Sequence, residues 1–347
     1  MIYKVNKHLL GVIDATTHIE DLEELTSHRS VAAIPFGGRY RLIDFILSNM
    51  VNSGIQSVAI FPKFQYRSLM DHLGSGKNWD LNRKRDGLFF FPSPRLDKPI
   101  FGINSFEHFA ENMDFLTRST QEYCLISNAN TIFNMDLSPL LDWHIDSNCD
   151  ITEVQKNGRS INLFLVKTSL LLDLIHTRKE TGYLNMKDVV TDLNSPYRVC
   201  HYSYEGYALT VDSISTYYAA SMELLNREIW EKLFLQERPI LTKVKDEPPT
   251  RYTSSAVVFN SMIANGAQIE GTVENSIIAR GVHIAKGAVV KNSIIMQKTV
   301  IQENCVLEHA ILDKDVKIEQ GTTIIGTEQV PKILRKGSIV KGECVSS

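Results

Sequence analysis

Two arginines beside a glycine turn are the first residues in this sequence that could bind and act on an anion. The segment SVAAIPFGGRYRLIDFILSNMVNSGI, residues 30–55, places Arg39 and Arg41 directly after a turn at residues 35–38. Fixed positive charges at a turn suit a phosphorylated ligand, because the guanidinium fork matches the geometry of phosphate oxygens. The apolar run that begins at Leu42 predicts a buried helix behind the turn, and Asn52-Ser53-Gly54 predicts where that helix ends.

Further basic residues lie downstream and could complete an anion-binding patch. The full set of candidates is Arg39, Arg41, Lys63, Arg67, Arg83, Lys84 and Arg85. On motif grounds, ordinary solvated side chains are an equally good interpretation of the basic residues near NWDLNRKRDG. The net charge of the chain is −3, so the chain as a whole has no footprint of nucleic-acid or membrane binding.

The cysteines and the apolar segments indicate the compartment. The cysteines are scattered without a CxxC pair, which argues against a disulfide framework and a thiolate zinc site. We expect small, mostly reduced apolar residues at Cys124, Cys149, Cys200, Cys305 and Cys344. The first residues, MIYKVNKHLLGVIDA, have no long apolar run or cleavage site, and INLFLVKTSLLLDLI is interrupted by Lys167 and Asp173. We therefore expect a cytoplasmic protein.

Residues 1–235 alternate strand-like and helix-like patterns. The continuous apolar runs HLLGVIDA, SVAIFP, YCLISN and INLFLVK are typical of parallel strands buried on both faces. Between and after them lie amphipathic stretches, IEDLEELTSHRS, QYRSLMDHL, FAENMDFLTRS and SISTYYAASMELLNREIWEKLF. This alternation predicts an α/β domain with a mostly parallel sheet, whose ligands bind beyond the carboxyl ends of the strands.

A change of composition and an internal repeat predict a second domain. Residues 236–254 are charged, rich in proline and without a helical period, and they predict a linker. In residues 255–347, two sets of isoleucines recur every 17 residues: Ile284, Ile301 and Ile318, and Ile277, Ile294 and Ile311. Gly287, Asn304 and Gly321 follow the first set at turn positions that need a positive φ. Three six-residue sides per coil predict a left-handed parallel β-helix, with an antiparallel meander as the weaker alternative.

The order of these motifs resembles a known family. PFGGRYRLIDFILSNMVNSGI, HLGSGKNWDLNR, GYALTVDSISTYYAASMELL and the hexapeptide repeats together resemble ADP-glucose pyrophosphorylase, or glucose-1-phosphate adenylyltransferase. The resemblance covers essentially the whole chain. It implies a Rossmann-like nucleotidyltransferase domain followed by a left-handed parallel β-helix, which agrees with the patterns above.

The same resemblance shows which family elements this chain lacks. The family's glycine-rich triphosphate loop and its arginine are absent, and the corresponding segment carries Glu20, Asp21, Glu23 and Glu24, which favour a solvated helix face over phosphate binding. Val31 stands at the position of the phosphate-contacting lysine.

The two metal-binding aspartates of the family are also replaced. Asn130 stands at the first position in NANTIFNMD, where the alignment is uncertain by one residue, and Thr210 stands at the second. Asp212 lies two residues further on, about 6–7 Å along a strand, which is too far to substitute without a shift. Since phosphoryl transfer depends on charge stabilisation, we expect the chain itself to lack catalytic residues and to bind no metal.

The resemblance therefore implies a non-catalytic subunit of ADP-glucose pyrophosphorylase. Such a subunit assembles with a catalytic partner as a heterotetramer, and Mg²⁺ is expected only in the partner. Arg39 matches a basic position that contacts a sugar-phosphate activator in some members, so an effector site is also expected.

Two other readings remain open. One is an active sugar-1-phosphate nucleotidyltransferase with a rearranged site, in which Asp14 or Asp136 holds a metal. The other is an acyltransferase, as in many β-helix proteins, with His283 or His309 as its catalytic residue.

Overall fold

The first domain is built on one seven-stranded sheet. The computed structural model describes residue 6 and residues 8–63, 65–93 and 105–345. The sheet order is β10 (Val199–Ser203), β8 (Ile151–Lys156), β9 (Arg159–Lys167), β6 (Tyr123–Asn128), β1 (Leu9–Ala15), β4 (Ser57–Pro62) and β5 (Gly87–Phe90). β6, β1, β4 and β5 run parallel to one another, as predicted.

The run INLFLVK departs from the predicted parallel arrangement. It forms β9, which is antiparallel to both of its neighbours, β6 and β8. A strand covered on both faces has the same apolar pattern in either direction, so the sequence could not reveal its orientation.

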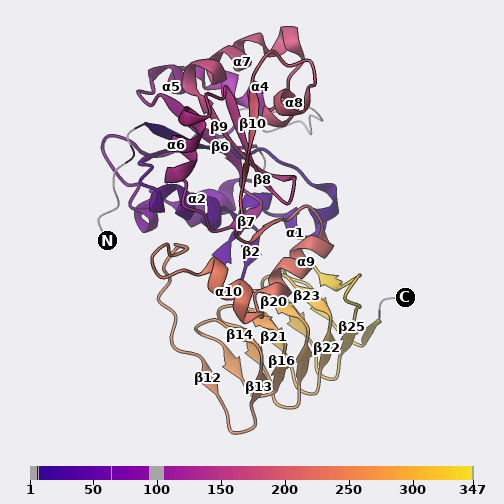
Figure 1. Cartoon of the computed structure of the whole chain (residues 1–347). Coiled ribbons are helices and arrows are strands. Elements are labelled where there is room, and N and C mark those ends of the chain that lie inside the picture. Colours follow the sequence, from indigo (N-terminus) through magenta and orange to yellow (C-terminus); the bar gives the residue numbers. More distant parts are fainter. Residues whose placement is uncertain (1–5, 7, 64, 94–104, 346–347) are drawn as a thin grey trace.

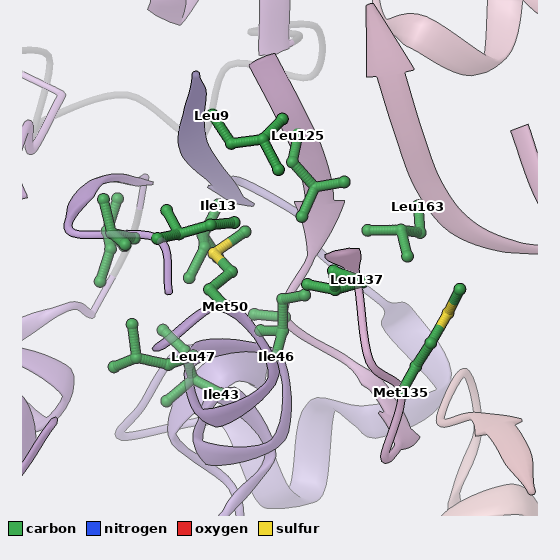
Figure 2. Packing of buried hydrophobic residues seen from close by; sticks show 14 of the residues in the cluster. Leu9, Ile13, Ile43, Ile46, Leu47, Met50, Leu125, Met135, Leu137 and Leu163 are labelled. Carbon is green, nitrogen blue, oxygen red and sulfur yellow. The ribbon is translucent and has the colours of Figure 1, made fainter. Parts of the chain in front are cut away.

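Helices cover both faces of this sheet (Figure 1). One face is covered by α2 (Leu42–Asn52), α3 (Arg67–Leu73) and α6 (Ser138–Asp146). Figure 2 shows the apolar side of α2, with Ile43, Ile46, Leu47 and Met50, beneath Leu9 and Ile13 of β1. The other face is covered by α4 (Ser105–Glu111), α5 (Met113–Arg118), α7 (Thr168–Thr181) and α8 (Met186–Thr191). The predicted end of α2 is confirmed, with Ser53 as its C-cap and Gly54 at φ +80°.

Shorter elements join the sheet to the second domain. They are η1 (Glu20–Leu22), α1 (Glu23–Thr26), η2 (Val31–Ala33), η3 (Lys77–Trp79), α9 (Ile214–Glu223) and α10 (Arg227–Leu233). Two small antiparallel pairs accompany them, β2 (Pro35–Phe36) with β3 (Tyr40–Arg41), and β7 (Thr131–Phe133) with β11 (Ala208–Thr210). No helix or strand lies between Leu233 and Arg251.

The second domain is a left-handed parallel β-helix with three sheets. The first sheet contains β12 (Arg251–Tyr252), β15 (Gln268–Ile269), β18 (His283–Ile284), β21 (Val300–Ile301), β24 (Lys317–Ile318) and β27 (Ile339–Val340). The second contains β13 (Val257–Phe259), β16 (Thr272–Glu274), β19 (Val289–Lys291), β22 (Val306–Glu308), β25 (Thr323–Ile325) and β28 (Glu343–Val345). The third contains β14 (Met262–Ile263), β17 (Ile277–Ile278), β20 (Ile294–Ile295), β23 (Ala310–Leu312) and β26 (Lys332–Leu334).

The 17-residue repeat corresponds to one coil, so equivalent residues of successive coils pair within each sheet. Ile284 pairs with Ile301 and Ile301 with Ile318, and their side chains fill the interior of the coil. The predicted turn residues Gly287, Asn304 and Gly321 all have positive φ, at +77°, +57° and +71°.

The second isoleucine set lies on the outside of the coil. Ile277, Ile294 and Ile311 pair in register, but their side chains pack against the first domain, in a cluster with Phe36, Tyr217 and Tyr218. Their neighbours Ile278, Ile295 and Leu312 point into the coil instead. Successive residues of a strand face opposite sides, so a buried pair at each repeat serves both the interior and the domain interface.

One cysteine prediction is wrong. Cys149, in the turn before β8, and Cys200, in β10, form a disulfide across the sheet edge, with 6.0 Å between their Cα atoms. Only the pairing of β8 with β10 brings them together, since 51 residues separate them in sequence. Cys124 and Cys305 are free and buried, as expected, while the side chain of Cys344 lies outside the described residues.

Candidate functional site

Asn130 and Thr210, which the resemblance places at the family's metal-binding aspartates, lie close together where strands β7 and β11 pair. Thr131 and Thr210 are partners in the strand register, and their hydroxyl oxygens are 3.0 Å apart. Asn130 directly precedes β7, and its carboxamide nitrogen donates to the Val211 carbonyl at 2.8 Å. A second hydrogen bond joins the same two residues through the main chain, since the Val211 N–H donates to the Asn130 carbonyl at 2.8 Å.

This arrangement does not fit the Mg²⁺ that catalytic relatives are expected to bind. Asn130 is 3% exposed, and its carboxamide already holds β11 to β7 through a donated hydrogen bond that a carboxylate could not make. Its Oδ1 has no hydrogen-bond partner among the described residues, but an uncharged oxygen beside threonine hydroxyls is a poor ligand for a hard dication. Within the described ranges, no three His, Cys, Asp or Glu side chains form a group that could hold a metal ion.

Asp14 and Asp136, the two carboxylates proposed for a rearranged site, and Asp212 beside Thr210 all accept hydrogen bonds from other residues. Asp14 accepts from the backbone N–H and hydroxyl of Thr16, at 3.0 and 2.7 Å, and from the Ser105 hydroxyl. Asp136 accepts from the Ser138 N–H at 3.0 Å, at the start of α6. Asp212 accepts from the Thr216 hydroxyl at 3.0 Å, at the start of α9.

The other two replaced elements have structural roles. Val31 is 5% exposed in η2 and packs with Ile34 and Leu42 in the cluster that faces the β-helix. A lysine ammonium at this buried place would carry a large desolvation cost. In the segment that replaces the glycine loop, the acidic residues Glu20, Asp21 and Glu23 are exposed, as the solvated-face interpretation predicts.

Basic side chains gather where the first domain meets the β-helix. Arg41 of β3 donates to the carbonyl and hydroxyl oxygens of Ser68, both at 2.8 Å, and its backbone N–H donates to Asp44. Burial lowers the pKa of Arg41 to about 10, with a smaller effect from the charge of Arg29. Burial, and then the charges of Arg41 and Arg29, lower the pKa of Lys314 to about 7.

Lys245 and Arg280 complete this interdomain basic cluster, which comprises Arg29, Arg39, Arg41, Lys245, Arg280 and Lys314. Burial lowers the pKa of Arg280, and the nearby charge of Arg39 adds to that effect. Burial lowers the pKa of Lys245 as well, followed by the charges of Arg280 and Arg41. Asp44, Glu247 and Asp313 offset part of this positive charge, and the remaining excess of cations favours an anion between them. No motif in the sequence marks Lys245, Arg280 or Lys314, since they belong to the interdomain segment and to separate coils.

The other candidate anion residues lie elsewhere. Lys63 is buried near Asp14, whose charge opposes the lowering of the Lys63 pKa by burial. Arg67 is exposed at the start of α3. Arg83 is paired with Asp80, and Lys84 and Arg85 are exposed beside it. The structure therefore places Arg39 and Arg41 in the interdomain cluster and gives the remaining candidates other surroundings.

The two histidines considered for acyl transfer both have partners. His283 lies 3.1 Å from a Glu270 oxygen on the neighbouring coil. The Nδ1 of His309 lies 2.9 Å from the Tyr218 hydroxyl, which also donates to the Asn292 carbonyl. These contacts tie α9 to the β-helix and give His309 a structural role.

The fold and the site together define the class of protein: a nucleotidyltransferase fold joined to hexapeptide coils. Residues 20–158 match the nucleotidyl transferase family, and residues 248–345 match the GlmU-like C-terminal hexapeptide family. Among curated proteins, the chain is 53% identical over 342 residues to glycogen biosynthesis protein GlgD of Bacillus subtilis, covering 99% of each. It is 57% identical over 346 residues to GlgD of Geobacillus stearothermophilus, covering 99% of this chain and all of that protein.

More distant relatives include named enzymes. The chain is 30% identical over 329 residues to glucose-1-phosphate adenylyltransferase of Mycoplasma mobile, covering 83% of this chain and 85% of that enzyme. The chain belongs to the GlgD family. The predicted resemblance to the ADP-glucose pyrophosphorylases is confirmed. Within its described parts, the chain has no helix that combines the length and apolar character needed to cross a bilayer.

Proposed function

We propose that this chain is a non-catalytic subunit of ADP-glucose pyrophosphorylase in glycogen biosynthesis. It assembles with a catalytic subunit and alters that subunit's turnover or its response to effectors. The observation that carries the proposal is the Asn130 carboxamide, which donates to the Val211 carbonyl where a catalytic relative would present a metal-binding carboxylate.

The rest of the chain supports this proposal because its scaffold is intact. Val31 is a core residue and the glycine loop is absent, so the chain lacks two elements with which the family holds a triphosphate. The first coil of the β-helix leaves the large apolar side chains of Tyr252, Val257, Val258 and Phe259 exposed. Exposed apolar surface of this kind is typical of proteins that assemble with a partner.

The interdomain basic cluster supports an effector role. Arg39 and Arg41, which follow the glycine turn, share this cluster with basic residues of the β-helix, so an anion bound there would contact both domains. A sugar phosphate is the effector that we propose for this site.

The test compares the purified chain alone, a catalytic subunit alone, and the two mixed, by ADP-glucose formation and by native mass. The glucose-1-phosphate adenylyltransferase of Geobacillus stearothermophilus is a suitable catalytic subunit, since it is 29% identical to this chain. We expect no synthesis by this chain alone, a mixed complex in the native spectrum, and a changed turnover of the partner.

A matched control uses the same partner with its own metal-binding aspartates replaced. The mixture with this inactive partner should make no ADP-glucose. Synthesis by this chain alone, abolished by a substitution within it, would instead support an active nucleotidyltransferase with a rearranged site.

A further inference from the structure

A pocket outside the replaced catalytic positions lies where the first domain meets α10. Its volume is about 690 Å³, inside the range of roughly 300–1,000 Å³ of small-molecule sites. The walls come from the end of β7, from β10 and the residues after it, and from α10 with its following segment. Neither Asn130 nor Thr210 lines it, and no residue of the interdomain basic cluster does.

The floor of the pocket holds a buried amide with an unmet acceptor. Asn134 is 3% exposed, and its Nδ2 donates to the carbonyls of Leu233 and Arg238, at 2.7 and 2.9 Å. These two bonds fix the orientation of the carboxamide, because only its nitrogen can donate to a carbonyl. The Asn134 Oδ1 is then left without a hydrogen-bond partner among the described residues.

A buried donor with no partner lines the same pocket. The Nε of Arg238 is buried and makes no hydrogen bond within the described part of the chain. Both atoms are closed to solvent in the unbound chain, so a ligand meets them only when the side chains that cover them move aside. Because leaving such groups unmet is costly, that movement favours a ligand that both accepts and donates hydrogen bonds. A hydroxyl group does both. An ammonium only donates, and a phosphate dianion only accepts.

The walls supply the other two features that a sugar needs. Tyr202 lines the pocket, and its ring is held edge-to-face against Trp143 at 5.4 Å, which leaves it as a stable apolar surface for the C–H face of a sugar ring. The carboxylates of Asp136, Glu205, Glu228 and Glu231 outnumber the two cations, Lys232 and Arg238. This excess of two negative charges accepts hydrogen bonds from hydroxyl groups and repels phosphorylated sugars.

We propose that this pocket binds a short neutral saccharide. The preference for a neutral saccharide follows from the hydrogen-bonding groups of the pocket. The narrower choice of an α-glucan rests on the proposed role in glycogen biosynthesis. Maltotriose serves as the probe for a free oligosaccharide, glycogen as the probe for a chain end, and glucose 1-phosphate as the charged competitor. Binding is measured by calorimetry on the chain alone, so the result is independent of any catalytic partner.

The variants separate the pocket from general effects on stability. Glu231→Gln on α10 should weaken maltotriose binding about tenfold, the usual loss for a hydrogen bond to a charged group. Arg227→Ala is the matched control, because it breaks the same Arg227–Glu231 ion pair without touching the pocket. Tyr202→Ala should weaken binding similarly, with its thermal unfolding checked alongside.

Each outcome decides the proposal. Binding of maltotriose or glycogen that Glu231→Gln weakens and Arg227→Ala leaves unchanged supports the proposal, and the tighter of the two probes identifies the source. Tighter binding of glucose 1-phosphate in this pocket, saccharide binding that neither pocket variant changes, or no heat at any sugar concentration overturns it.

Discussion

Arg29 of the first domain and Asp313 of the β-helix form a buried ion pair between the two domains. The Nη2 of Arg29 donates to both carboxylate oxygens of Asp313, at 2.7 and 2.9 Å, and Nη1 donates to the Leu25 carbonyl at 3.0 Å. The two residues are only 3% and 1% exposed. Arg29 and Asp313 are 284 residues apart in sequence, and their ion pair joins the two domains close to Lys314 and Arg41.

Arg29→Met should destabilise the protein by about 3–5 kcal/mol, because it leaves a buried carboxylate without its cation. The double variant Arg29→Met/Asp313→Leu should recover much of that loss, since no uncompensated charge remains. Urea unfolding of the single and double variants measures the coupling between the residues. The exposed pair of Arg227 and Glu231 is the control, where Arg227→Ala should cost far less than Arg29→Met, because solvent screens the pair. Equal costs at both pairs would contradict the prediction.

Asn130→Asp should destabilise the protein by about 1–3 kcal/mol and should not create a metal site. The aspartate loses the hydrogen bond to the Val211 carbonyl and places a buried carboxylate against that oxygen. Denaturant unfolding with and without Mg²⁺ measures both effects, with Asn194→Asp on an exposed turn as the control. A gain of stability on adding Mg²⁺ would show that the site can still hold the ion.

Anion binding at the interdomain basic cluster should weaken as the pH rises through 7. The pKa of Lys314 is lowered to about 7, mainly by burial, so its ammonium attracts an anion below this pH and is neutral above it. Sulfate is the best probe, because its own charge stays constant between pH 6 and 8. Titration of Lys314→Met should show weaker binding at pH 6 and little change of affinity across this range.

The same cluster predicts how the assembled enzyme responds to a sugar phosphate. Arg39→Ala should raise the concentration needed of any activating sugar phosphate, because Arg39 is exposed and lies beside Arg280 of the β-helix. Arg85→Ala, an exposed arginine away from the cluster, is the control. Activation constants that do not change for Arg39→Ala would count against the effector role.

The Cys149–Cys200 disulfide should stabilise the oxidised protein by about 2–4 kcal/mol, because it closes a long loop in the unfolded chain. Peptide mapping without reductant should find the crosslinked pair. A reductant should lower the unfolding temperature of the wild-type protein and have no such effect on Cys200→Ser. If both proteins respond equally to the reductant, the bond does not form in solution.

The sequence by itself determined most elements of the fold and their order. The 17-residue spacing of Ile284, Ile301 and Ile318 predicted the register of the coils, because a regular coil repeats its backbone and therefore its side-chain positions. The helix after the glycine turn, with its end at Asn52-Ser53-Gly54, was also predicted correctly, since capping and periodicity are local properties. That Val31 and Thr210 replace site residues of the family is a prediction from motif positions.

Only the tertiary structure decided what those positions do instead. The sequence could not show that Asn130 donates to Val211, that Lys314 joins Arg41, or that Cys149 meets Cys200. It also could not separate Ile294, which faces the first domain, from Ile295, which fills the coil, because both are buried. Burial, pairing and charge repulsion depend on which surfaces meet, and a local pattern carries no information about segments brought together from hundreds of residues away.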